Sequence, residues 1–229
     1  MRGPFLFLAF ALWIIFAQVR AETPLLPVDV ALVLAVDISA SVDAREHRLQ
    51  MAGIAAALQS EAVLKAIAAA PRKRIAIAIT QWSGLNVQRV VVPWTIIDGE
   101  ASAVTLARRV LTSPRADPGG GTSLSLALDH AARLFATAPP ATRRVIDIST
   151  DGINNIGPPL DDINRTLGRN KITVNGLAIT SDWPKLGDYL SKNVITGPAA
   201  FATEADGFQA FGDAMLSKLL REIRGPGLS

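Results

Sequence analysis

Five side chains that carry hydroxyl or carboxylate oxygens lie where this 229-residue chain leaves apolar segments or a glycine-rich turn. They are Asp37, Ser39, Ser41, Thr122 and Asp151. Such oxygens are the ligands that Mg²⁺ prefers, and because Mg²⁺ keeps several waters, a site needs only a few of them. Ser39 and Ser41 are two residues apart just after a predicted strand, so both hydroxyls can face one point. These residue types therefore predict a divalent-cation site.

Two apolar runs must position these side chains at one edge of a sheet. Residues 30–36 and 145–150 read as buried parallel strands, because helices cover both faces of such strands. The first run ends at Asp37 and the second at Asp151. If the two strands are neighbours where the strand order reverses, their carboxylates flank the crevice in which open α/β sheets bind ligands. Thr122 would then come from the facing loop, whose three glycines allow close backbone approach.

The rest of the chain alternates predicted strands and helices, which indicates a doubly wound α/β sheet with helices on both faces. Strands are predicted at 30–37, 74–82, 87–97, 145–150, 172–179 and 199–203, and helices near 43–58, 62–69, 104–111, 123–137, 160–168, 183–190 and 207–223. Asp43 and Glu46 have capping-box spacing at the first helix. A turn at 83–86 makes the second and third strands an antiparallel hairpin, and Pro93 puts the third at the sheet edge. The expected sheet is therefore six-stranded and mostly parallel.

The order D-x-S-x-S, then a threonine, then an aspartate resembles the metal-ion-dependent adhesion site of von Willebrand factor A (VWA) domains. The resemblance extends from about residue 28 to 223 and implies a VWA, Rossmann-like fold. In that family the two serines and the threonine bind the ion, and the two aspartates act largely through waters. By position these roles fall on Ser39, Ser41 and Thr122, and on Asp37 and Asp151. The segment 193–201 also resembles a stretch shared by uncharacterised secreted VWA-like proteins of proteobacteria.

Each member of the set also has a simpler explanation when it is taken alone. Ser41 could be a helix N-cap, Thr122 the N-cap of the helix near 123–137, and Asp151 part of an Asp-Gly turn. The order of all five at strand ends and a glycine loop favours the metal site over coincidence. Asp147 shares a strand face with Asp151 but lies deeper, so we predict a structural acid bonded to backbone N–H groups, Arg143 or Arg144 rather than a metal ligand.

Residues 1–21 predict a secretory signal, with Arg2 before an apolar stretch at 4–17 and a small-residue cleavage site at 19–21. The apolar stretch is shorter than the ~20 residues that a spanning helix needs, so cleavage is favoured over a retained anchor. We expect a periplasmic or secreted protein with no membrane span after cleavage. Its parts are a leader at 22–27, one VWA-like domain at 28–225 and a tail at 226–229.

Composition excludes several other classes of protein. The chain has no cysteine, so it forms no disulfides and no Cys-type zinc site, and its two histidines exclude a three-histidine zinc site. Without residues 1–21, 21 basic residues face 20 acidic ones, a net charge of +1. Basic residues are dispersed, which argues against nucleic-acid binding.

The function that the resemblance implies is an exported, non-enzymatic module that binds a protein ligand through Mg²⁺, with Mn²⁺ or Ca²⁺ as other suitable ions. An acidic residue of the partner would fill the open position on the metal. One alternative is a Mg²⁺-dependent phosphatase, but such enzymes need a second acid two residues after the first, and that place is Ser39. Another is an envelope assembly or structural factor whose metal only stiffens loops. Partner identity and oligomeric state stay open.

The last predicted helix, at 207–223, has two interpretations. In related adhesive VWA domains the last helix shifts along the sheet when the metal gains an acidic ligand. Here the apolar face formed by Phe208, Phe211, Met215 and Leu219 would have to slide. The competing interpretation is a static helix that closes the core, because coupling requires a demonstrated two-state element.

Overall fold

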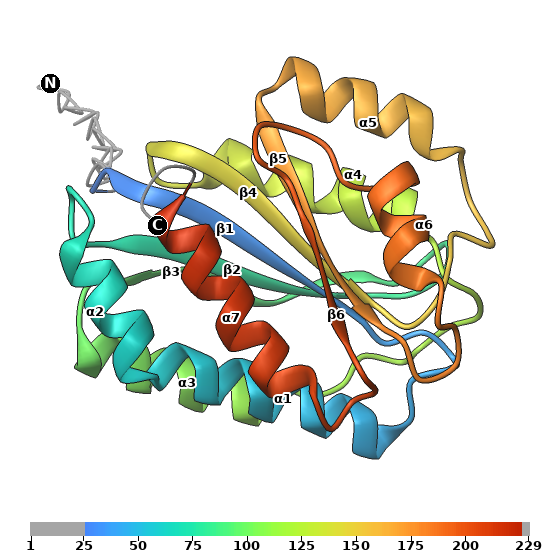
Figure 1. Ribbon diagram of the computed structural model, residues 1–229, viewed down its shortest axis with the longest axis horizontal. Helices are drawn as coiled ribbons and strands as arrows, with labels where there is room; N and C mark the ends of the chain where they lie inside the picture. Colours follow the sequence, from blue (N-terminus) through green and yellow to red (C-terminus); the bar gives the residue numbers. More distant parts are fainter. Residues whose placement is uncertain (1–25, 226–229) are drawn as a thin grey trace, which may run out of the picture.

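Six strands form the central layer of the computed structural model, which describes residues 26–225 (Figure 1). They are β1 (Val28–Asp37), β2 (Ile75–Trp82), β3 (Gln88–Ile97), β4 (Ala141–Thr150), β5 (Ile172–Ile179) and β6 (Ala202–Ala205). Their order in the sheet is β3-β2-β1-β4-β5-β6, and only the β2–β3 pair is antiparallel. This confirms the mostly parallel, six-stranded sheet, with the Pro93 strand at one edge. The predicted signal, most of the leader and the tail lie outside the described residues.

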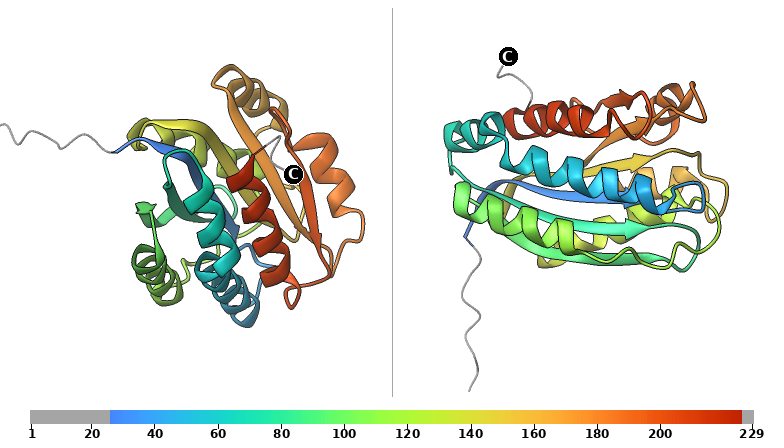
Figure 2. Two further views of the ribbon diagram at one scale, coloured as in Figure 1. Left: turned by 60° about the vertical axis from the view of Figure 1, so that its left-hand side comes forward. Right: turned by 90° about the horizontal axis from the view of Figure 1, so that it is seen from below.

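Seven α-helices cover both faces of the sheet in the described part of the chain (Figure 2). They are α1 (Ala44–Gln59), α2 (Glu61–Ala69), α3 (Glu100–Thr112), α4 (Leu124–Leu134), α5 (Leu160–Arg169), α6 (Leu186–Asn193) and α7 (Phe211–Arg224), with a 3₁₀ turn at Phe135–Thr137. One apolar cluster joins one face of the sheet to α1, α2, α3 and α7, and a second joins the other face to α4, α5 and α6. The doubly wound architecture is confirmed.

Burial of the central strand β1 on both faces explains why its sequence does not alternate between apolar and polar residues. All ten of its residues are buried, and β2 and β4 pair with it on either side. Residues buried on both faces of a parallel strand are selected for apolarity throughout. At the following helix, the Asp43 carboxylate accepts from the backbone N–H groups of Arg45 and Glu46, and Glu46 accepts from that of Asp43. The predicted capping box is therefore present.

Three element boundaries near the end of the chain differ from prediction. Helix α6 begins at Leu186 rather than 183, because Trp183–Lys185 form a turn closed by the Leu186 N–H on the Trp183 carbonyl. Strand β6 begins at Ala202 rather than 199, because Ala199 has a positive φ of 54°. Helix α7 begins at Phe211 rather than 207, because Gly207 has a φ of 74° and opens a turn. Positive φ is incompatible with either regular element.

No single helix among residues 26–225 is long and apolar enough to cross a membrane. Helices α1 and α2 reach the necessary length and apolar composition only as a pair, and they are bent by 52° at the break between them.

Candidate metal centre

The candidate site lies at the C-terminal edge of the sheet, between β1 and β4. These two strands are neighbours, with Val36 beside Ser149. The chain proceeds from β1 towards β2 and β3 on one side, and β4, β5 and β6 follow on the other. The strand order therefore reverses between β1 and β4, which is where open α/β sheets form a ligand crevice. Asp37 ends β1, and Asp151 directly follows β4.

Asp37 is held at this edge by hydrogen bonds to both of its carboxylate oxygens. Oδ1 accepts from the Ser39 backbone N–H at 2.7 Å, and Oδ2 accepts from the Thr150 hydroxyl at 2.6 Å. The Asp37 backbone carbonyl accepts from Gln50 Nε2 of α1 at 3.1 Å. Asp37 is fully buried. These contacts fix its orientation from three separate elements.

A chain of short contacts joins Ser39, Ser41 and Asp151. The hydroxyl oxygens of Ser39 and Ser41 are 3.2 Å apart, and the Ser41 hydroxyl donates to Asp151 Oδ1 at 2.8 Å. Ser39 and Asp151 are buried, whereas Ser41 is exposed. Two hydroxyls and a carboxylate therefore meet at a point that solvent can reach.

Thr122 approaches the same place from the glycine loop. Its backbone N–H donates to Asn155 Oδ1 at 2.8 Å, and the Asn155 N–H donates to the Thr122 carbonyl at 3.0 Å. A Cβ atom on Gly152, the residue after Asp151, would lie 3.4 Å from Thr122 Oγ1, so this hydroxyl faces the start of the β4–α5 loop. The structure therefore brings all five predicted residues to one edge of the sheet.

Close packing of two loops explains part of the glycine run. A Cβ atom on Gly84, in the β2–β3 turn, would lie only 1.8 Å from the Gly120 carbonyl oxygen. Gly119 and Gly121 have φ values of 44° and 76°, which side-chain-bearing residues rarely adopt. These glycines let the loop before Thr122 lie against the end of β2.

The simpler explanations for Ser41 and Thr122 do not hold. The N-cap of α1 is Asp43 rather than Ser41, and the N-cap of α4 is Ser123 rather than Thr122. Both hydroxyls are therefore free of a capping role. Asp151 does lie in the turn that follows β4, where Gly152 N–H donates to the Thr150 hydroxyl at 3.1 Å.

The site concentrates negative charge. Burial, followed by the charge of Asp151, raises the pKa of Asp37 to about 7, against hydrogen bonds from Ser39 and Thr150 that lower it. Burial also raises the pKa of Asp151, although the Ser41 hydroxyl opposes this. Among the ion pairs of residues 26–225, none involves either carboxylate. A cation from solution would relieve this repulsion, so the donor set fits a divalent ion.

Hydroxyls carry much of this donor set. Across residues 26–225, no group of three or more His, Cys, Asp or Glu side chains is arranged to hold a metal ion. A cation at this edge would therefore depend on Ser39, Ser41 and Thr122 together with the two carboxylates. That composition suits a hard cation that keeps part of its water shell.

Several supporting residues were not predicted from the sequence. Arg115 of the α3–α4 loop donates to the carbonyls of Ile38 and Val42, on either side of the serine segment. Gln50 and Thr150 were also missed, although both hold Asp37. Gln50 lies on the buried face of α1, and a polar residue on an apolar face was the signal that could have revealed it.

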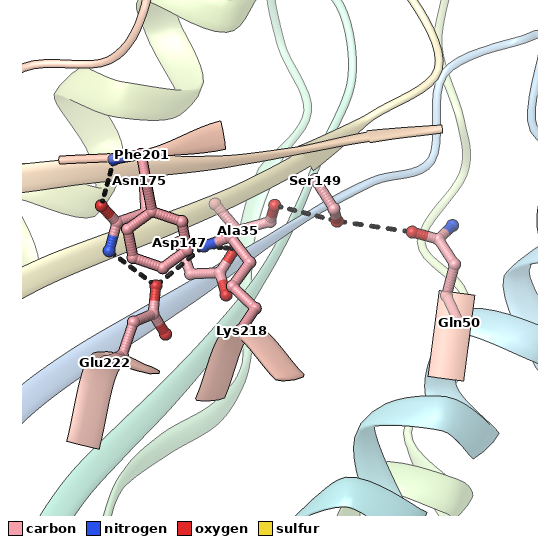
Figure 3. Close-up of polar contacts among 8 residues, drawn as sticks. All are labelled: Ala35, Gln50, Asp147, Ser149, Asn175, Phe201, Lys218 and Glu222. Carbon is pink, nitrogen blue, oxygen red and sulfur yellow. Dashed lines mark hydrogen bonds and ion pairs between the residues drawn. The ribbon is translucent and has the colours of Figure 1, made fainter. Parts of the chain in front are cut away.

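Asp147 is buried as predicted, but its predicted partners were wrong (Figure 3). Its Oδ1 lies 2.8 Å from Lys218 Nζ of α7, and the same Nζ lies 2.8 Å from Glu222 Oε1. Asn175 of β5 donates to this Glu222 oxygen at 2.8 Å. Burial, followed by the charge of Glu222, raises the pKa of Asp147 to about 7, while Lys218 lowers it.

The two arginines that were expected to pair with Asp147 point to backbone carbonyls instead. Arg143 donates to the Ile223 carbonyl at 2.8 Å, and Arg144 donates to the Asn170 carbonyl at 2.5 Å. Arg144 is three residues from Asp147 and so faces the other side of the sheet, while Arg143 lies nearer the start of the strand. Lys218 reaches Asp147 because α7 packs over the sheet.

Comparison with known proteins places this architecture among VWA domains. A family model described as "Protein of unknown function (DUF1194)" matches residues 27–227. No curated protein matches the chain by sequence. Proximal thread matrix protein 1 (PTMP1) of the mussel byssus is similar in structure, with a TM-score of 0.63 and 14% identity over 86% of this chain and 48% of that one. Another structure of PTMP1 has zinc in its metal-ion-dependent adhesion site (MIDAS) motif.

Two bacterial structures give the same result. The pilus adhesin SpaC of Lactobacillus rhamnosus GG has a TM-score of 0.60 and 12% identity, over 86% of this chain and 31% of its own. A von Willebrand factor type A protein of Catenulispora acidiphila has a TM-score of 0.59 and 18% identity, over 86% and 43%. This chain therefore spans between about a third and a half of these proteins. The likeness shows a VWA-like fold.

Proposed function

This chain belongs to the DUF1194 family, and from that premise and its VWA-like fold we propose that it is an exported, non-enzymatic module that binds a protein ligand through a divalent cation. One observation carries the proposal. Ser39, Ser41 and Asp151 are linked by contacts of 3.2 and 2.8 Å at the point where the strand order reverses, beside the buried Asp37. Oxygen donors that converge there, with no basic partner among residues 26–225, favour a metal site.

The proposed ligands divide into two groups. Ser39, Ser41 and Thr122 hold the ion directly, and Asp37 and Asp151 hold it largely through waters. Mg²⁺ is the proposed ion, and Mn²⁺ and Ca²⁺ also suit oxygen donors. The zinc-occupied MIDAS of PTMP1 supports metal binding by this fold. With few charged direct ligands, the bound ion offers an electrophilic position to a carboxylate of the partner.

The residues near Asp37 argue against a phosphatase. An enzyme of this kind pairs a nucleophilic aspartate with a general acid two residues later. The position two residues later, where a general acid would stand, is Ser39. A phosphoester panel with Mg²⁺ is expected to give background rates, and turnover that Asp37→Asn abolishes would contradict the proposal.

The partner and the location are proposed from the structural neighbours and the predicted signal. PTMP1 is a byssus matrix protein and SpaC a pilus adhesin, which suits a protein-binding role outside the cytoplasm. Together with the predicted signal at residues 1–21, this supports a periplasmic or secreted module. Its partner would present an acidic residue to the metal.

Titration calorimetry with Mg²⁺ and with Mn²⁺ tests the metal site directly. The native protein is expected to bind one ion, and Ser39→Ala to lose most of the heat because a direct ligand is removed. Ser191→Ala, at an exposed serine of α6, is the matched control and should bind like the native protein. Equal heats for Ser39→Ala and the native protein would refute the assignment.

Affinity capture separates a ligand-binding metal from a structural one. Native protein and Asp37→Ala are used as bait for the envelope fraction of the source organism, each with and without EDTA. A protein ligand is expected to be lost both on chelation and in Asp37→Ala. Partners retained in EDTA would assign the metal to loop stiffening instead.

A further inference from the structure

A cavity of about 970 Å³ lies at the other end of the sheet, away from the candidate metal centre. Its walls are the first residues of β4 and β5, the C-terminal half of α7 and the segment at 197–201. In a parallel sheet these strand ends lie opposite the C-terminal edge between β1 and β4 that carries the candidate metal centre, hereafter the metal edge. The cavity is thus a separate place on the molecule, and a ligand bound there would not depend on the metal.

Basic side chains dominate the charge of this cavity. The five that line it are Arg143, Arg144, Lys171, Arg221 and Arg224, and the one acidic lining residue is Glu222. Among the ion pairs of the described chain, none involves these five cations. Glu222 is already bonded to Lys218 at 2.8 Å inside the protein. The charge that faces the cavity is therefore strongly positive.

The acids near Arg143 do not neutralise this surface. Arg143 is half-buried and feels the negative charges of Glu222 and Asp29. Asp29 lies 3.7 Å from Arg72, which is its ion-pair partner, and it accepts from the Arg72 backbone N–H at 2.9 Å. Asp29 therefore has its own basic partner, and Glu222 shares Lys218 with Asp147. Two acids near five basic lining residues still leave a positive surface for an anion that enters the cavity.

Below the basic rim the cavity has an apolar surface. Val145 and Ile172 of the strands, Leu220 of α7 and Phe201 contribute to its lining. The guanidinium carbon of Arg221 lies 3.7 Å from the centre of the Phe201 ring, a cation–π contact that holds this arginine at the rim. Small-molecule sites are typically clefts of ~300–1,000 Å³ with apolar walls and a few polar groups, and this cavity has that character.

We propose that this cavity binds a small amphiphilic anion, in which a carboxylate or phosphate head pairs with Arg221 and Arg224 and an apolar body lies on Leu220 and Val145. Guanidinium groups suit such heads because their paired N–H donors match two oxygens of the anion. An inorganic anion alone would leave the apolar wall uncovered, and an uncharged amphiphile would leave the rim unpaired. The head and the body together account for the observed lining.

Calorimetry with decanoate, decyl phosphate, inorganic phosphate and decan-1-ol tests this pairing, with EDTA present throughout so that the cation site takes no part. Decanoate or decyl phosphate is expected to bind at least about tenfold more tightly than decan-1-ol and inorganic phosphate. Binding of the anions should weaken as salt is raised, because the rim is exposed. Equal affinity for decanoate and decan-1-ol, or no binding of either anion, would overturn the proposal.

Two double variants locate the site. In Arg221→Gln/Arg224→Gln, anion affinity is expected to fall about tenfold or more, since two charge-assisted contacts are lost. Arg89→Gln/Arg108→Gln removes the same charge from exposed positions on β3 and α3 and should leave affinity unchanged. Ser217→Trp, at an exposed lining residue of α7, should block entry while leaving the fold intact. Equal losses in both double variants would reduce the effect to net charge and contradict the assigned site.

Discussion

The molecule contains two places where buried carboxylates crowd together, and they differ in the source of positive charge. Under α7, Asp147 and Glu222 share the ammonium group of Lys218, with both contacts at 2.8 Å. At the metal edge, Asp37 and Asp151 have no ion-pair partner among the described residues. Burial raises the pKa of Asp37 and of Asp147 to about 7 in each case. Burial is the largest cause in both places, but among the described residues only the place under α7 has a cation from the chain itself.

The same kind of residue thus serves stability under α7 and, in the function we propose, binding at the metal edge. The Lys218 cluster is closed, because its cation comes from the fold itself and its residues are almost completely buried. The metal edge is open, because Ser41 is exposed and no basic residue of the described chain pairs with the two carboxylates. Active and binding sites commonly keep such destabilising arrangements at the expense of fold stability. Supplying or removing a charge should therefore change the stability of the fold differently in the two places.

Replacing Lys218 with Met is expected to have the largest effect. It leaves two buried carboxylates without their cation, and breaking a buried pair in this way typically costs ~3–5 kcal/mol of the free energy of unfolding. Chemical denaturation measures this loss. Lys65→Met is the matched control, because the Lys65–Glu61 pair is highly exposed and should contribute less than ~1 kcal/mol. If the two variants lost similar stability, the Lys218 cluster would not be a closed structural pair.

A second substitution identifies which charge causes the loss. In Lys218→Met/Asp147→Asn one of the two stranded carboxylates is neutral, so part of the stability should return. If Asp147→Asn changes the free energy of unfolding equally in Lys218→Met and in the native protein, the loss comes from packing of the lysine stem instead.

Lys218 also shows where sequence reasoning failed. Strands β1 and β4 were predicted because residues buried on both faces give continuous apolar runs, and Pro93 located the edge strand. Lys218 lies between Met215 and Leu219 on the buried face of α7, where a charged residue should indicate a buried partner. The partner, Asp147, lies on a strand far away in the sequence. Such pairing is set by how elements pack, and hydrophobic periodicity does not encode it.

The five residues of the candidate site were predicted from the sequence, but the residues that hold them in position were not. A fixed order of residues at strand ends predicted five metal ligands, and the structure places all five at one edge because parallel strands bring their C-terminal ends together. Their role as ligands stays a prediction. Thr150, Gln50 and Arg115 were missed because each acts through a contact to Asp37 or to a loop carbonyl. Boundaries near Ala199 and Gly207 were missed because positive φ values there are not visible in side-chain patterns.

The contribution of Asp37 to the pH dependence of stability can be isolated with the variant Asp37→Asn when metal is absent. The pKa of Asp37 is raised from 3.8 to about 7, so between about pH 4 and pH 7 the folded state keeps a proton that the unfolded chain has lost. Stability therefore falls as pH rises through this range, by ~4 kcal/mol for this group. Asp37→Asn should remove that fall, because an amide does not ionise in this range. The fold should tolerate it, because the amide N–H can donate to the Thr150 hydroxyl, which in turn donates to the Gly152 carbonyl at 3.0 Å.

The free energy of unfolding is measured by chemical denaturation in EDTA at several pH values, for the native protein and for Asp37→Asn. The difference between the two proteins is then compared across pH. This difference is needed because burial lowers the pKa of His47 to about 4, which makes stability rise with pH over part of the same range. His47 contributes equally to both proteins and cancels. Parallel curves for the two proteins would show that Asp37 ionises in the folded state as easily as in the unfolded chain.

Added Mg²⁺ should supply the metal edge with the positive charge that Lys218 supplies under α7. A ligand that binds only the folded state stabilises it by RT ln(1 + [L]/Kd), which is ~2.7 kcal/mol at a hundredfold excess over Kd. We expect the fold to survive EDTA and the melting temperature to rise with Mg²⁺ in the native protein. The rise should be absent in Ser39→Ala and retained in Lys65→Met. A native protein that unfolds on chelation would instead place the ion among the structural cations.

The smallest expected effect is on α7, where we predict no change in hydrogen exchange when the metal edge is filled. The helix is tied to β4 through Lys218 and Asp147, and to β5 through Glu222 and Asn175, with each contact at 2.8 Å. Sliding would break these buried bonds, and a metal ion held by Asp37, Ser39, Ser41, Thr122 and Asp151, none of which belongs to α7, supplies no contact that compensates for the loss.

Hydrogen exchange of residues 211–224 is therefore compared in EDTA, in Mg²⁺, and in Mg²⁺ with a captured ligand. Protection should be the same in all three conditions for the native protein, and lower in all three for Lys218→Met because the tie to β4 is lost. The native comparison is the critical one. If protection of α7 changed when the metal edge was filled, the two carboxylate clusters would be coupled through α7, and the closed cluster would be one position of a switch rather than a fixed anchor.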